Sequence, residues 1–66
     1  MNIQLNGESR PLSGLVTLIE LLEAEGLAER RVAVEVNNEI VPRSQHGDYR
    51  LKDGDVVEIV HALGGG

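Results

Sequence analysis

Residues 51–66, LKDGDVVEIVHALGGG, contain the pattern that decides the fold. Within this stretch the residues from Val56 to Ala62 form an apolar run interrupted only by Glu58 and His61, and a short apolar run rich in β-branched residues predicts a β-strand. Val57 and Ile59 are expected to face the core, which places the intervening side chains on the open face of the sheet. The last predicted strand therefore leads directly to a glycine-rich end.

The end itself consists of Gly64, Gly65 and Gly66. Three residues without a Cβ form a thin, pliable segment, and we predict a flexible tail over residues 62–66. With Gly66 as the last residue, its α-carboxylate is expected to be free. A carboxylate on a slender arm can enter the narrow active site of a partner enzyme and be activated there. A frayed terminus is the alternative interpretation of the same residues.

Two pairs of short strands are predicted upstream, and each pair is joined by a turn whose residues tolerate positive φ. The turns are Asn6-Gly7 and Asn37-Asn38, and the strands cover residues 1–5, about 8–12, 32–36 and 39–41. Pro11 cannot donate a hydrogen bond to a neighbouring strand, so its strand is expected at an edge of the sheet.

A short helix is predicted between the two hairpins. Thr17 and Glu20 have the S/T-x-x-E spacing of a capping box. Gly26 can adopt the left-handed conformation that ends a helix, so the helix should cover about Leu18 to Glu25. Residues 43–50 show no clear pattern and are expected to be irregular.

These elements predict an α+β fold in which one mixed sheet is covered on one face by the helix. The predicted core consists of apolar residues on the inward faces: Ile3, Leu5, Leu18, Leu21, Leu22, Val34, Val36, Leu51, Val57 and Ile59. On the opposite face, apolar side chains would form an exposed patch that can serve as a partner surface. Its members are Ile40, Val56, Val60 and Ala62.

The composition limits what the chain can do. Its 66 residues predict one domain, residues 1–66. The absence of cysteine excludes a thiolate zinc site or a thiol nucleophile and agrees with a cytoplasmic location. The net charge of -5 disfavours nucleic acid as a partner. The sequence also lacks the long apolar run of a membrane span and the pattern of a signal peptide.

No residue pattern predicts catalysis or metal binding. His46 and His61 have no obvious third ligand, so we expect each to be structural or exposed. The serines lack His and Asp partners at an interpretable spacing, and the acidic stretch on the helix is expected to be a solvated face. We therefore expect no catalytic residue, no bound metal and no bound cofactor.

Four stretches resemble one known family: residues 37–43 (NNEIVPR), 51–55 (LKDGD), 57–60 (VEIV) and 64–66 (GGG). With the order of the predicted elements, they are similar to the ubiquitin-like β-grasp fold and, within it, to the ThiS family of sulfur carriers of thiamine biosynthesis. The Val-Pro-Arg stretch favours ThiS over MoaD, the small subunit of molybdopterin synthase. Family members often have an aromatic residue shortly after this stretch, whereas residues 44–47 here are Ser-Gln-His-Gly, which leaves the partner contact of that aromatic in question.

The resemblance implies a specific chemistry. An E1-like adenylyltransferase of the ThiF type would use ATP to adenylate the Gly66 carboxylate, and a persulfide donor would then replace AMP to give a thiocarboxylate. That sulfur would pass to a thiazole synthase of the ThiG type. Two alternatives stay open: a MoaD-like carrier that serves molybdopterin or another acceptor, and a β-grasp module that only binds a partner non-covalently.

Overall fold

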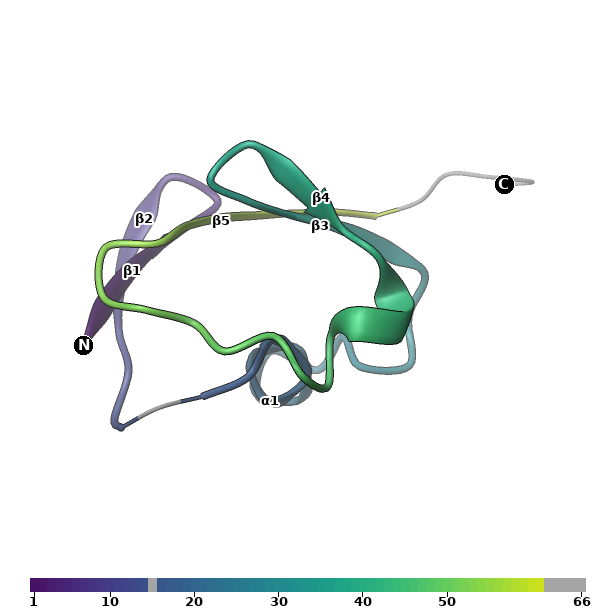
Figure 1. Ribbon diagram of the computed structural model, residues 1–66, viewed down its shortest axis with the longest axis horizontal. Coiled ribbons are helices and arrows are strands. Elements are labelled where there is room, and N and C mark those ends of the chain that lie inside the picture. Colours follow the sequence, from purple (N-terminus) through teal and green to yellow (C-terminus); the bar gives the residue numbers. More distant parts are fainter. Residues whose placement is uncertain (15, 62–66) are drawn as a thin grey trace.

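The computed structural model describes residues 1–14 and 16–61. Its elements, in chain order, are β1 (Asn2–Leu5), β2 (Glu8–Pro11), α1 (Leu18–Ala24), β3 (Val32–Val36), β4 (Glu39–Val41), the 3-10 helix η1 (Arg43–Gln45) and β5 (Val56–His61). Figure 1 shows the sheet curved over α1, which covers one face. The predicted α+β arrangement of one sheet and one main helix is confirmed.

The sheet is mixed, with the strand order β2-β1-β5-β3-β4. β5 pairs in parallel with β1 and antiparallel with β3, so the last strand in sequence is the central strand in space. β2, which contains Pro11, forms one edge, as the proline predicts.

Both predicted hairpin turns are present. Asn6 and Gly7 have φ values of 51° and 85°, and Asn37 and Asn38 have values of 53° and 71°. Positive φ at both central residues is the geometry that suits a two-residue hairpin, because its twist matches that of the flanking strands.

The helix begins and ends by the two devices that its sequence predicts. Thr17 is the N-cap of a complete capping box with Glu20. At the other end Gly26 has φ of 74°, and the Leu27 N–H donates to the Leu22 carbonyl at 2.8 Å. This bond closes a Schellman motif. The helix ends at Ala24, with Glu25 as its C-cap, one residue earlier than predicted.

Residues 43–50 were predicted to be irregular, and this was wrong for the first three, which form η1. The segment that follows η1 completes the N-terminus of α1. The Leu18 N–H donates to the Tyr49 carbonyl at 2.9 Å, and the Ile19 N–H donates to the His46 carbonyl at 3.1 Å. Amides in the first turn of a helix have no partner inside it, so these bonds satisfy donors that the capping box leaves free. The packing of the helix therefore depends on a loop that comes about thirty residues later.

The core contains every residue that the sequence predicted for it. All ten are buried, and Val41, which sequence reasoning did not select, joins them. Two polar side chains, His46 and Asp55, are buried as well. Val41 was missed because β4 has only three residues, too few for an alternating pattern to show which face is inward.

We predict that Thr17→Ala lowers the free energy of unfolding by about 1 kcal/mol, because it removes the side-chain half of the capping box. Urea denaturation followed by circular dichroism measures the change. Thr17→Ser keeps the acceptor oxygen and should stay near the parent value. An alanine variant as stable as the serine variant would show that the cap does not contribute.

Candidate functional site

The described part of the chain ends at His61, the last residue of β5. Four of the predicted site residues, Ala62, Gly64, Gly65 and Gly66, lie outside the described residues, and so does the predicted flexible tail over 62–66. The structure does describe the strand that precedes these residues in the sequence. His61 pairs with Val32 at one end of the sheet, and Val57 within β5 is completely buried. The residues that come next in the sequence therefore follow the central strand of the sheet.

Polar side chains in the turns fix β5 to the rest of the sheet. The buried Asp55 carboxylate accepts from the Lys52 N–H at 2.8 Å and from the Asn37 side-chain amide at 3.0 Å. The Asn37 side-chain oxygen accepts from the Val56 N–H at 2.9 Å. At the other hairpin, the Asn6 side-chain oxygen accepts from the Ile59 N–H at 2.8 Å.

Sequence reasoning identified these turns but not their second role. Asp55, just before β5, is a buried acceptor that orients the start of this strand. An aspartate that bonds the amide three residues earlier is a recurrent local arrangement. That spacing is visible in the sequence, but the long-range partner, Asn37, is not.

The open face of the sheet, on the side away from α1, carries the predicted apolar residues. Ile40 is 69% exposed, Val60 60% and Val56 39%, so their predicted exposure is confirmed. The register places Val60 beside Ala33 and Ile40 beside Glu35. Among the described residues, these apolar side chains are therefore distributed over the face.

Two acidic residues, Glu35 and Glu58, lie side by side on this face, and we call this pair the acidic row. Glu35 of β3 and Glu58 of β5 are directly opposite each other in the antiparallel ladder. Side chains at such positions have Cβ atoms about 5 Å apart, and like charges there repel. This pair has no local signal in the sequence, because its two residues are 23 positions apart in the chain. Only the strand register brings them together.

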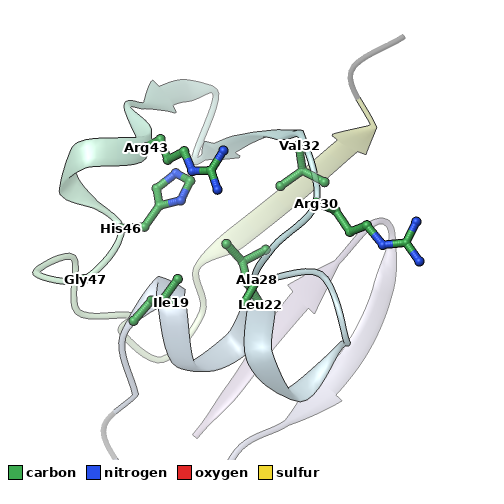
Figure 2. Close-up of a pocket in the computed structure, with 8 residues that line it drawn as sticks. All are labelled: Ile19, Leu22, Ala28, Arg30, Val32, Arg43, His46 and Gly47. Atoms are coloured by element: carbon green, nitrogen blue, oxygen red, sulfur yellow. The ribbon is translucent and has the colours of Figure 1, made fainter. Parts of the chain in front are cut away.

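A hollow lies elsewhere on the molecule, between α1, the segment before β3 and η1 (Figure 2). We call it the basic hollow, with a volume of about 130 Å³. Its lining residues are Ile19, Leu22, Ala28, Arg30, Val32, Arg43, His46 and Gly47. It includes His46 and Gly47 of the stretch 44–47, where the resemblance noted above led us to expect an aromatic residue.

One titratable side chain of the hollow, His46, has a structural partner. The His46 ring is buried and its Nε2 donates to the Val41 carbonyl at 3.0 Å, which agrees with the predicted structural role. His61 is exposed. Burial raises the pKa of Tyr49 above its ordinary value of 10.0, and the carboxylates of Asp55 and Glu39 raise it further. Among residues 1–14 and 16–61, no three His, Asp or Glu side chains converge as a metal site would require.

Within the same ranges, no helix is long and apolar enough to cross a bilayer.

Comparisons with known proteins agree on one family. The sequence model of the ThiS family matches residues 3–66. The chain is 47% identical over 64 residues to the sulfur carrier protein ThiS of Thermus thermophilus, with 97% of this chain and 98% of that protein covered. It is 46% identical over 66 residues to a thiazole synthase of Paramagnetospirillum magneticum, where it covers all of this chain but only 20% of that protein.

A solved structure supports the same assignment. The crystal structure of the thiamine biosynthesis protein ThiS from Geobacter metallireducens matches with a TM-score of 0.86 and 36% sequence identity, over 100% of both chains. The predicted ubiquitin-like β-grasp fold is thereby confirmed. The chain spans about a fifth of the length of the thiazole synthases that it matches.

We predict that Glu58→Gln raises the free energy of unfolding by about 0.5 kcal/mol, because it removes the repulsion from Glu35 across the ladder. Chemical denaturation at low ionic strength measures the effect, which should shrink as salt screens the two charges. Glu8→Gln is the matched control, since it removes the same charge at a strand position opposite Leu5. Equal stabilisation by both substitutions would mean that only the net charge matters.

Proposed function

The chain belongs to the ThiS family, and from that premise we propose that it is a sulfur carrier of thiamine biosynthesis whose reactive group is the α-carboxylate of Gly66. The observation that supports this most strongly is the match of residues 3–66 to the family model. The alignment with the sulfur carrier of Thermus thermophilus also covers nearly the whole length of both proteins. The geometry of β5 agrees with it, because the central strand leads directly to the glycines.

The carrier supplies a carboxylate and a docking surface, and its partners supply the catalysis. An E1-like adenylyltransferase of the ThiF type binds the chain and ATP. A Gly66 carboxylate oxygen attacks the α-phosphorus, which gives an acyl-adenylate and releases pyrophosphate. The terminal sulfur of a persulfide donor then attacks the acyl carbon and displaces AMP. A thiol cleaves the resulting acyl disulfide, which leaves the thiocarboxylate on Gly66.

A narrow channel in the partner explains why the chain should end in glycines. Residues without a Cβ pass where bulkier residues would clash with the walls. Fully extended, the chain from Val60 to Gly66 would reach on the order of 20 Å from the sheet. The carboxylate can thus react inside the partner while the domain stays at its surface.

The open face is the surface that we assign to this docking. Ile40, Val56 and Val60, with Ala62 beyond the described residues, would contact apolar groups of the adenylyltransferase. The acidic row between them would face basic groups of that enzyme, and a chain of net charge -5 would be attracted to such a surface during encounter.

The sulfur acceptor that we propose is a thiazole synthase of the ThiG type. Two relatives that carry a domain similar to this chain, from Paramagnetospirillum magneticum and Magnetococcus marinus, are thiazole synthases. A carrier joined to its acceptor enzyme in one polypeptide indicates that the two work together. We propose that this sulfur transfer takes place in the cytoplasm. We also propose that the carrier itself binds neither a metal nor a cofactor.

Intact-mass spectrometry tests the proposal. After incubation with ATP, the adenylyltransferase, a persulfide donor and a thiol, the mass should rise by the difference between sulfur and oxygen. A chain that lacks Gly66 should fold normally and show no change. Unchanged mass of the parent protein, with an enzyme that charges a known ThiS, would contradict the proposal.

The same product identifies the acceptor. The thiocarboxylate should be consumed when a thiazole synthase and its substrates are added, and the carboxylate form should return. If molybdopterin synthase consumes it and thiazole synthase does not, the carrier belongs to the alternative, MoaD-like route.

A further inference from the structure

The contacts and chemical steps proposed above do not use the basic hollow, yet its lining is organised. Ile19, Leu22, Ala28 and Val32 provide apolar surface, while Arg30 and Arg43 provide cationic groups. His46, bonded to the Val41 carbonyl, completes the wall. Figure 2 shows the Arg43 side chain beside His46 at the rim of the hollow, on the η1 side. The result is a small concave surface with an apolar floor and a basic rim.

The charge of this lining is unusual for the chain. The sequence has eleven acidic and six basic residues, but none of the eight lining residues is acidic. In the part of the chain that the structure describes, the single ion pair joins Arg10 to Glu25. Arg30 and Arg43 are exposed and have no carboxylate partner there. Their guanidinium groups are therefore available to a ligand from outside.

The hollow is also next to the point from which the chain continues toward Gly66. Val32 lines the hollow, and in the sheet Val32 pairs with His61, the last residue of β5. Figure 2 shows the end of β5 passing beside Val32. An enzyme that takes up residues 62–66 must therefore approach this end of the molecule, and some part of its surface comes close to the basic hollow.

We propose that the basic hollow receives an acidic side chain, Asp or Glu, of the adenylyltransferase that activates Gly66. This inference rests on the proposed function. A carboxylate forms short, paired hydrogen bonds with a guanidinium group, and its methylene groups would contact the apolar floor. The volume of about 130 Å³ suits a side chain of this size, whereas pockets for larger organic ligands measure roughly 300–1,000 Å³.

The two proposed contacts of the carrier, at the open face and at the basic hollow, would involve opposite charges. The acidic row on the open face meets basic groups, and the basic hollow meets an acidic group, so a carrier docked in the wrong orientation would bring like charges together. Such an arrangement chiefly sets orientation and specificity. It would direct the glycine tail into the active site and not along the enzyme surface.

A kinetic comparison tests the proposal. Arg30→Glu combined with Arg43→Glu should raise the KM for the carrier in pyrophosphate release by about tenfold or more, with kcat unchanged, because only docking is altered. Arg50→Glu combined with Lys52→Glu is the matched control, since it changes the net charge equally at exposed residues outside the hollow. The control should stay within about twofold of the parent.

The milder pair Arg30→Gln and Arg43→Gln should give a smaller rise in KM, and it provides the readout if the charge-reversed chain does not fold. A KM that is equal in the hollow and control variants would overturn the proposal.

A second experiment, a phosphate titration, distinguishes a protein partner from a free anion. Inorganic phosphate, titrated at millimolar concentration, should leave the amide NMR signals of Ala28 and Gly47 unchanged. Movement of those signals, with phosphate competing against the enzyme, would show that the hollow binds a small anion and would overturn the assignment to a partner side chain. If the parent protein is not adenylated at all, the proposed function fails first, and this inference fails with it.

Discussion

The structure depends on the central position of β5. This strand comes last in the described chain, yet it pairs on one side with β1 and on the other with β3. The core therefore closes only when the C-terminal part of the sequence is in place. Buried Asp55 and the turn asparagines hold the start of the strand. Because the sequence goes on directly from β5, residues 62–66 follow the central strand of the sheet.

This constraint agrees with chemistry that takes place outside the domain. A chain of 66 residues without cysteine has little capacity for an enclosed catalytic site. A firmly packed base is what a reactive terminus needs, since motion of the base would lower the chance of entering a partner's channel. In the proposed function, the open face and the basic hollow would serve recognition, and their opposite charges would act on the orientation of the carrier.

The sequence predicted the parts of the fold that depend on local rules. The capping box at Thr17, the left-handed Gly26 and the two asparagine turns follow from residues a few positions apart. The alternation in β1, β3 and β5 identified the core because side chains of a strand alternate strictly between two faces.

Features that depend on register or on distant contacts could not be predicted in the same way. The repulsive pair Glu35 and Glu58 exists only because the strands align as they do. The basic hollow combines residues from three separate segments, and the bonds from Leu18 and Ile19 to the later loop leave no sequence signal. The exposure of Ile40, Val56 and Val60 was predicted, but the acidic row between them was not.

The most direct test of the account replaces the carboxylate and nothing else. A semisynthetic chain that ends in a Gly66 amide keeps the fold, the open face and the basic hollow, but it has no acid to adenylate. Exchange of labelled pyrophosphate into ATP by the adenylyltransferase should proceed with the free acid and be absent with the amide, which should still bind the enzyme. Equal exchange by both forms would contradict the account, because the group activated would then lie elsewhere on the chain.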